Sequence, residues 1–298
     1  EQIWIGTWGG GVARLDLPTG QITAFTAGEP AGGDFVYALH RDSRGVLWAG
    51  TRAGLRRLEG TGAAARFVDY PLAARGPITS IAEDGRGTLW LGGEAGLIRL
   101  DPESGQAAGV PSAGAAGDDF VNALWFDRAR GQLWVGARSG LYRLDAASGQ
   151  SVHFAHDSAR PESMAAGQVT SLMSDQPDRL WIGSDGGLSV ADMRGATPAF
   201  RTFTHNPDDP ASLAAGTVVS LLADYSGGIW AGAWTGGLSV YHPARFKFAA
   251  PQPTSGLPVS FALDADGGLW VGTFGEGLLR LDGHLAERER RRALARDV

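Results

Sequence analysis

A tryptophan recurs seven times in the same local setting along this chain of 298 residues, and this repeat limits the fold more than any other feature. Each of these tryptophans is followed two positions later by glycine, and successive copies are 40 to 49 residues apart. Self-similarity at such a period is typical of solenoids and propellers. The repeated tryptophans are Trp4, Trp48, Trp90, Trp134, Trp181, Trp230 and Trp270.

Residues 78–101 show how one repeat is built. Alternating apolar residues predict strands at 78–82, 88–92 and 97–100, with a tight turn between each pair. Glycine in these turns supplies the positive φ that a tight hairpin requires. A short fourth strand is clearest at 22–25, 152–154, 200–203 and 245–248.

Four short antiparallel strands in each repeat are typical of a propeller blade. A helical repeat would need amphipathic stretches of ten or more residues, and the sequence contains none. We therefore predict an all-β fold, a seven-bladed β-propeller of four-stranded antiparallel blades, with the recurring tryptophans packed between neighbouring blades. The propeller is expected to be a single domain over residues 1–284, followed by an Arg-rich tail, helical or frayed, over residues 285–298.

The two ends of the propeller are incomplete in the sequence. The first repeat lacks its opening strand, and the last lacks a clear closing strand, so a ring could close by pairing these ends. The chain opens within a strand-like pattern at Glu1, and we expect it to be a piece of a longer protein, with a larger propeller or a second one as alternatives.

Composition excludes several classes of function. The net charge is −6 and the basic residues outside the tail are dispersed, which disfavours nucleic-acid binding. The chain has no cysteine, so disulfides, thiolate metal sites and a cysteine nucleophile are excluded. No run of 18 apolar residues is present and no signal peptide is visible, so we predict no membrane contact by this chain.

No cofactor or metal is predicted. His156 and His205 occupy equivalent positions between repeats, and we expect them to cap and pack these linkers, because a metal would need further ligands nearby. The segment 264–267 faintly resembles a calcium loop, but the twelfth position is Gly275 instead of a bidentate glutamate. A repeated aspartate that begins a turn is interpreted as structural: Asp42, Asp84, Asp127, Asp175, Asp224 and Asp264.

The repeats resemble the two-component regulator propeller repeat, whose pattern joins a strand and a turn to "LWIGT", "GGL" and a short strand. Residues 81–92 and 224–232 match this pattern, and residues 205–213 resemble the family's linker, with a degenerate copy at 156–164. The resemblance covers about residues 1–282. It implies the periplasmic sensor part of an inner-membrane signalling protein. Its partner would be an output domain of the same polypeptide, a histidine kinase, often a hybrid one, or a diguanylate cyclase, outside this chain.

One position varies while its surroundings stay constant, namely the fourth residue after each repeated tryptophan. It lies on the loop between the second and third strands and is always large or charged: Trp8, Arg52, Glu94, Arg138, Asp185, Trp234 and Phe274. The blades with an aromatic residue here also have one extra loop residue, and in a closed ring these three blades are neighbours. We therefore predict an aromatic arc facing a charged arc at the channel mouth.

Such an arrangement suits a small polar or carbohydrate-like ligand, an oligosaccharide for example, because aromatic rings stack on flat apolar faces and arginine pairs with carboxylate or phosphate. The alternative is that these side chains only cover the blade tops or pair with one another, Arg with Glu. No catalytic motif is present, so we predict a ligand-sensing domain and not an enzyme.

Two other functions stay open. A propeller lyase or glycosidase would need an acid–base pair in the channel, for which Glu94 and Asp185 are the candidates at this loop position. A protein-docking or dimerisation scaffold, such as a homodimer, would instead present a large exposed apolar patch and a featureless channel mouth.

Overall fold

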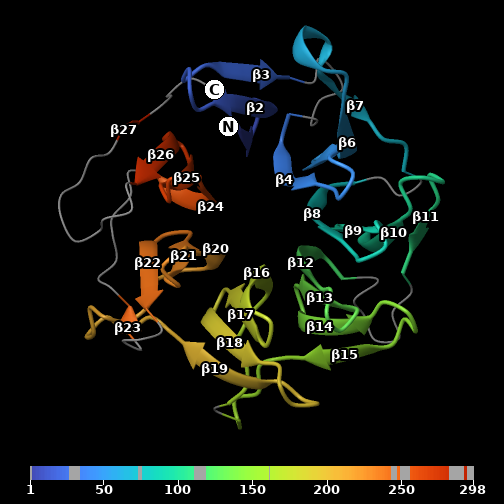
Figure 1. The fold of residues 1–298 in the computed structure, drawn as a ribbon. Helices are drawn as coiled ribbons and strands as arrows, with labels where there is room; N and C mark the ends of the chain where they lie inside the picture. Colours follow the sequence, from blue (N-terminus) through green and yellow to red (C-terminus); the bar gives the residue numbers. More distant parts are fainter. Residues whose placement is uncertain are drawn as a thin grey trace. The chain divides into compact units, whose positions relative to one another are not determined.

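The computed structural model describes residues 2–26, 34–72, 76–110, 119–160, 162–242, 247–248, 256–281 and 292–293. They form a seven-bladed β-propeller of small antiparallel sheets, as predicted (Figure 1). Six of these sheets have four strands and the first has three. Within the described residues the helical structure is a single 3₁₀ turn, Gly62–Ala64, and no helix is long and apolar enough to cross a bilayer.

The chain divides into two compact units, which are described one by one. Among the described residues, the first unit covers 2–138 and 142–153 and so holds the first three sheets and nearly all of the fourth. Its strands are β1 (Gln2–Gly6), β2 (Val12–Asp16) and β3 (Ile22–Phe25); β4 (Val36–Arg41), β5 (Leu47–Thr51), β6 (Gly54–Glu59) and β7 (Arg66–Asp69); β8 (Ile78–Glu83), β9 (Leu89–Gly93), β10 (Gly96–Leu100) and β11 (Ala107–Gly109); and β12 (Val121–Asp127), β13 (Gln132–Ala137), β14 (Gly140–Asp145) and β15 (Ser151–Phe154).

The second unit holds the last three sheets, within residues 139–141 and 154–293. Each sheet again follows chain order from one edge to the other. The strands are β16 (Val169–Gln176), β17 (Arg179–Ser184), β18 (Gly187–Asp192) and β19 (Ala199–Phe203); β20 (Val218–Ala223), β21 (Ile229–Ala233), β22 (Gly237–His242) and β23 (Lys247–Phe248); and β24 (Leu257–Leu263), β25 (Leu269–Phe274), β26 (Gly277–Leu281) and β27 (Arg292–Ala293).

The end of the chain differs from the expectation. Strand β27 pairs with β26 and gives the last sheet the closing strand that the sequence did not reveal. Arg292 and Ala293, the described part of the predicted tail, are therefore strand and not helix, because they complete the ladder of a hairpin. The rest of residues 285–298 lies outside the described residues, as do residues 245 and 246 of the predicted strand at 245–248.

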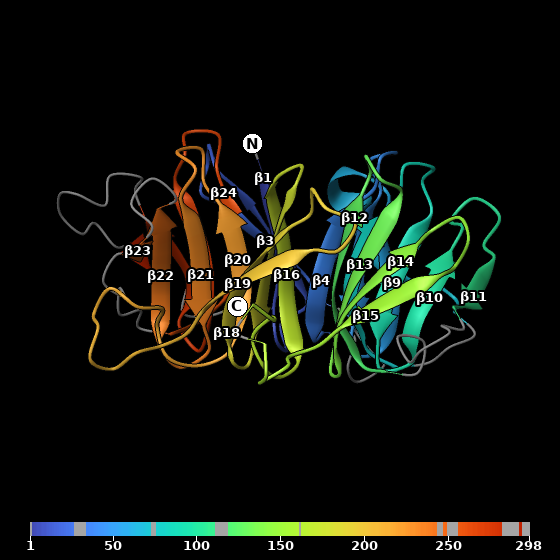
Figure 2. The ribbon, with the colours of Figure 1, turned by 90° about the horizontal axis from the view of Figure 1, so that it is seen from below.

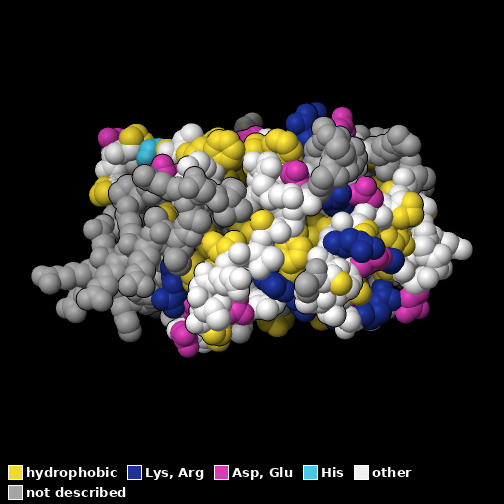
Figure 3. All heavy atoms as spheres, turned by 90° about the horizontal axis from the view of Figure 1, so that it is seen from above, with side chains coloured by type: hydrophobic (Ala, Val, Ile, Leu, Met, Phe, Trp, Pro, Cys, Tyr) yellow, Lys and Arg dark blue, Asp and Glu magenta, His cyan; other side chains and the backbone are white. Residues whose placement is uncertain are grey.

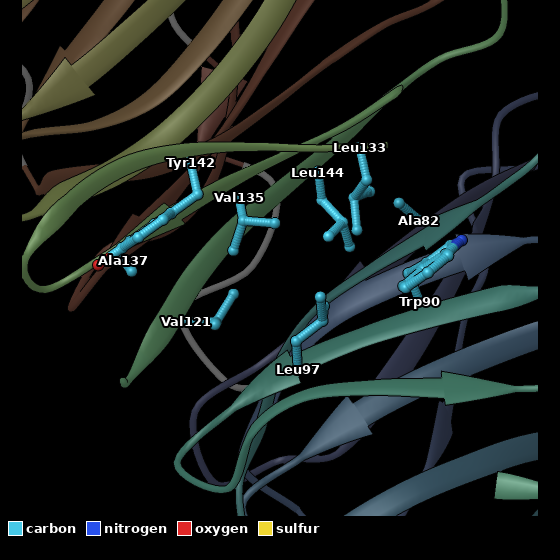
Figure 4. Close-up of a cluster of buried hydrophobic side chains, with 9 residues drawn as sticks. All are labelled: Ala82, Trp90, Leu97, Val121, Leu133, Val135, Ala137, Tyr142 and Leu144. Carbon is cyan, nitrogen blue, oxygen red and sulfur yellow. The ribbon is translucent and has the colours of Figure 1, made fainter. Parts of the chain in front are cut away.

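Within each unit, repeated tryptophans pack on the sheet that follows in the chain. Figure 4 shows Trp90 of β9 in a buried cluster with Val121 of β12 and Leu133 of β13. In the second unit, Trp181 packs in the same way on Val218 and Ile229 of the next sheet. Six of the seven are at most 5% exposed, and Trp4 on the three-stranded sheet is half-buried. The predicted role between neighbouring blades is thus confirmed within each unit.

Connections alternate between two ends of each sheet, because the strands run up and down (Figure 2). We call one end the turn end: it carries the turns that begin with the repeated aspartates, for example Asp42 after β4. We call the other the loop end: it carries the hairpin after each tryptophan strand, for example Arg52 after β5, and the linker that enters the sheet, for example Phe35 before β4.

The aspartates of the turn end are structural, as predicted, and they also bind the tryptophans. Four of them accept a hydrogen bond from the indole N–H of their own blade, over 2.8 to 3.0 Å: Asp42, Asp175, Asp224 and Asp264. Burial opposes the charge of Asp264, but hydrogen bonds from Arg280, Trp270 and Gly268 outweigh it and lower the pKa of this carboxyl below its ordinary value. The turn end is therefore a set of buried, bonded carboxylates.

Candidate ligand-binding site

All seven predicted residues lie at the loop end: six are on the hairpin after a tryptophan strand, and Phe274 is the last residue of the tryptophan strand β25. Trp8, Arg52, Glu94 and Arg138 belong to the first unit, and Asp185, Trp234 and Phe274 to the second. Trp234 is half-buried and the other six are exposed. They divide between two units, so the predicted aromatic arc opposite a charged arc stays a prediction.

The backbone at this position is held in the same way in several blades. Its N–H donates to the carbonyl of the last linker residue before the opening strand. The distance from N to O is 2.9 Å for Arg52 and Phe35, 3.0 Å for Arg138 and Phe120, and 2.8 Å for Trp234 and Thr217. The scaffold therefore fixes the backbone of these loops, and the side chains are free to differ between blades.

An aromatic cluster surrounds Trp8 in the first unit. The Trp8 ring meets Phe35 at a centroid distance of 6.4 Å and Tyr37 at 5.9 Å, both edge-to-face. A β-bridge joins Trp8 to Phe35, and the N–H of Gly9 donates to the carbonyl of Asp34 at 3.0 Å. Trp8 nevertheless stays 55% exposed. The linker before β4 thus holds an indole in place while much of its surface faces solvent.

The two arginines lie on phenylalanine rings instead of pairing with Glu94. The guanidinium carbon of Arg52 is 5.6 Å from the centroid of Phe35, and that of Arg138 is 5.6 Å from Phe120. Among the described residues neither arginine forms an ion pair, so the expected alternative of Arg–Glu pairing is wrong for them. The acid of the intervening blade stays outside their reach because each guanidinium turns toward its own linker.

Sequence reasoning missed the phenylalanines, although a signal was present. The blades with arginine at this loop position are those whose linker ends in Asp-Phe-Val, at residues 34–36 and 119–121. The other linkers have Pro77, Gln168, Thr217 or Leu257 at the position of the phenylalanine. This correlation between two positions of one repeat predicts that their side chains are in contact.

Each four-stranded sheet carries a β-bulge at the start of its opening strand. In β4, for example, the register shifts between Val36 and Ala38, which leaves Tyr37 as the extra residue. Bulges re-aim side chains and are common beside active sites. The extra residues are all half-buried at the loop end: Tyr37, Thr79, Asn122, Thr170, Val219 and Val259. They form a second set of variable positions, which the sequence analysis did not single out.

The second unit holds the remaining aromatic pair and one acid. The rings of Trp234 and Phe274 meet at a centroid distance of 6.0 Å, so these two predicted residues are brought together. Asp185 accepts a hydrogen bond from the hydroxyl of Thr217 at 3.1 Å, which ties it to the next linker. Glu94 and Asp185, the candidates for an acid–base pair, lie in different units. No cluster of three or more metal-ligating side chains occurs in the described parts of the chain.

The two linker histidines pack as predicted. His156 Nδ1 lies 2.9 Å from the carbonyl oxygen of Met164, and His205 Nδ1 lies 2.9 Å from that of Leu213. A hollow of about 220 Å³ lies beside the first linker, against Ser163 and Thr202. The hydroxyls of these two residues already bond within the protein, so this hollow offers a ligand fewer polar partners than the loop-end cluster.

The fold and the loop end together define a β-propeller with variable side chains on a repeated scaffold. The model of the two component regulator propeller family matches residues 31–53 and 74–95. Each match runs through an opening strand and the tryptophan strand into the hairpin that follows, and so includes Arg52 or Glu94. Two segments of the chain therefore match the two-component regulator propeller repeat, which the sequence was predicted to resemble. A search among curated proteins found no match.

Solved structures share the fold at low sequence identity. The extracellular domain of BT4673 from B. thetaiotaomicron, assigned to a one component system, is 19% identical with a TM-score of 0.54, and the alignment covers 95% of this chain and 45% of that one. Virginiamycin B lyase from Staphylococcus aureus is 16% identical with a TM-score of 0.67, with 91% and 88% covered. These likenesses show the fold alone, and this chain spans less than half of the BT4673 domain.

Proposed function

We propose that this chain belongs to a ligand-sensing, extracytoplasmic propeller of a membrane-bound signal-transduction protein, and that it binds a small polar or carbohydrate-like molecule at the loop end. The carrying observation is the cluster of Trp8, Phe35, Tyr37 and Arg52, in which an exposed indole and a cation both contact Phe35, the last residue before β4. Loops on a rigid scaffold are where binding residues concentrate.

The repeat family supports the signalling role, because its description names two-component regulators. The extracellular assignment of the BT4673 domain supports a place outside the cytoplasm. In this proposal the output part, a histidine kinase or a diguanylate cyclase, lies in the same polypeptide outside this chain. Ligand binding at the loop end would bias that output part through a change in the propeller or its contacts.

The chemistry of the cluster suits a flat, polar molecule. The exposed indole of Trp8 offers a face for stacking on an apolar ring face, and its contacts with Phe35 and Tyr37 fix its orientation. A side chain that is already ordered loses little conformational entropy when a ligand binds. Arg52 adds directional donors beside this face.

The exposed apolar side chains favour this function over protein docking, which would need a large apolar patch. Four large hydrophobic side chains of the described residues are exposed. Trp8 and Phe274 are at the loop end, Tyr225 is on a turn at the opposite end of its blade, and Val152 is on β15. On the face shown in Figure 3, hydrophobic, basic and acidic side chains are interspersed.

The test is thermal unfolding of the chain in the presence of oligosaccharides, organic acids and nucleotides. A ligand that binds only the folded state stabilises it by about 2.7 kcal/mol at a hundredfold excess over Kd. We expect Trp8→Ala to abolish the shift. Tyr225→Ala removes an exposed ring from the turn end and is the matched control, for which the shift should persist. A shift that survives Trp8→Ala would contradict a site at this cluster.

A further inference from the structure

Arg52 and Trp8 share one neighbour, the ring of Phe35. The guanidinium carbon of Arg52 lies 5.6 Å from the Phe35 centroid, and the Trp8 centroid lies 6.4 Å from it. Because both side chains contact the same ring, we treat them as parts of one site. The hairpin after β1 supplies Trp8, the linker before β4 supplies Phe35, and the hairpin after β5 supplies Arg52.

Arg52 has no acidic partner within the described part of the protein. Some arginines of the described chain pair with acids, as Arg44 does with Glu103, Arg56 with Asp69 and Arg179 with Asp175. Arg52 is exposed and forms no ion pair with any described residue. The guanidinium carries five N–H donors, and its place over the Phe35 ring leaves them without an acidic acceptor among the described residues.

We propose that Arg52 binds a carboxylate of the ligand that stacks on Trp8, so that the sensed molecule is a ring compound with an acidic group. The planar fork of arginine matches a carboxylate and forms two parallel, charge-assisted hydrogen bonds. The inference rests on the proposed function and narrows its ligand class. Two sources share this chemistry, a sugar acid and an aromatic acid.

Blade four supplies an internal control. Arg138 lies on Phe120 at the same distance of 5.6 Å, and its backbone is held in the same way. The hairpin of the preceding blade carries Glu94 there instead of Trp8, and the bulge residue is Asn122 instead of Tyr37. The hairpin beside that arginine therefore offers no exposed indole, and the charge of Glu94 on it disfavours an acid. We assign acid recognition to Arg52 and not to Arg138.

The experiment is calorimetric titration of the chain with two matched pairs of compounds: digalacturonic acid with its dimethyl ester, and benzoate with benzamide. We expect at least one acid to bind more tightly than its neutral twin. Arg52→Gln should weaken that acid about 10- to 100-fold, the effect of losing hydrogen bonds to a charged group, and leave the neutral twin unchanged. The pair that responds identifies the source of the acid.

Three further variants make the outcome decisive. Arg138→Gln should leave the affinity for the acid nearly unchanged, Arg52→Lys should give an intermediate loss because it keeps the charge without the fork, and Trp8→Ala should weaken acid and twin alike. The inference would be overturned if each acid and its neutral twin bound equally well, or if neither acid bound. It would also be overturned if Arg52→Gln and Arg138→Gln weakened acid binding equally. Neutral sugars that bind wild type but not Trp8→Ala would then leave the proposed function standing.

Discussion

The repeated positions differ between the two ends of the blades: the side chain recurs at the turn end and varies at the loop end. At the turn end one residue type, aspartate, recurs and makes the same indole bond in four blades. At the loop end the backbone bond recurs, but the side chain changes from aromatic to basic to acidic. A repeat protein thus separates its scaffold from its variable surface. Where the side chain and its hydrogen bond both recur, the role is structural. Where only the backbone hydrogen bond recurs, the side chain is available for recognition.

One blade sharpens the comparison, because its turn is incomplete. In blade three Asp84 accepts the backbone N–H groups of Arg86 and Thr88, as Asp42 does with the equivalent groups of its own turn. The buried Nε1 of Trp90, however, has no hydrogen-bond partner among the described residues. The turn can therefore form without the indole bond. The stability contributed by the backbone bonds of the turn can be measured separately from that contributed by the indole bond.

The largest expected effect comes from exchanging a tryptophan for alanine at each end. Trp181→Ala should cost about 3–5 kcal/mol of unfolding free energy, because it empties a buried space between two sheets. Trp8→Ala should cost about 1 kcal/mol or less, since its ring is half solvent-exposed. Urea unfolding followed by circular dichroism measures both. Equal losses would remove the distinction between the two ends.

A smaller effect is expected from the indole bond itself. A double-mutant cycle of Asp42→Ala and Trp48→Phe should show a coupling of about 1–2 kcal/mol, because the cycle isolates a buried hydrogen bond to a carboxylate. The same cycle with Asp84→Ala and Trp90→Phe should show almost none. Matching couplings in the two blades would mean that the indole of Trp90 is bonded after all in solution.

The smallest effect is a pH dependence that belongs to the turn end. Burial lowers the pKa of His40 below the 6.5 of an exposed histidine; Glu83 and Asp42 oppose this, and Arg128 adds to it. The unfolded chain then binds a proton more readily than the folded one, so stability should be constant above about pH 6.5 and fall as the pH drops below it. His40→Gln should flatten that fall. If the midpoint of urea unfolding falls equally steeply in both proteins between pH 7 and 5, groups other than His40 cause the pH dependence.

Sequence reasoning reached the elements whose cause is local. The tryptophan spacing, the glycine turns and the aspartates predicted seven sheets, and the internal comparison placed all seven variable residues at one end of the blades. It missed the features that depend on pairing between distant segments. A bulge at Tyr37 exists only in the register of β4 against β5, and strand β27 follows ten residues after β26, so neither leaves a pattern within a single strand.

The contacts of the arginines were missed for a related reason. Arg52 and Phe35 are separated by a whole hairpin, and only the folded linker brings the guanidinium onto the ring. Sequence reasoning offered Arg–Glu pairing as the alternative, from charge alone, without the direction that each side chain takes. Comparing linker and hairpin positions together across the repeats would have found the contact, because phenylalanine and arginine occur in the same two blades.

The bulges have a consequence for how such a protein changes over generations. The extra residue of a bulge has no paired residue on the neighbouring strand. Its side chain can therefore be replaced without changing the strand register. Six sheets offer this freedom at the same place, and the present occupants already range from tyrosine and asparagine to valine. If the loop end binds a ligand as proposed, its preference can change one blade at a time while the seven sheets stay the same.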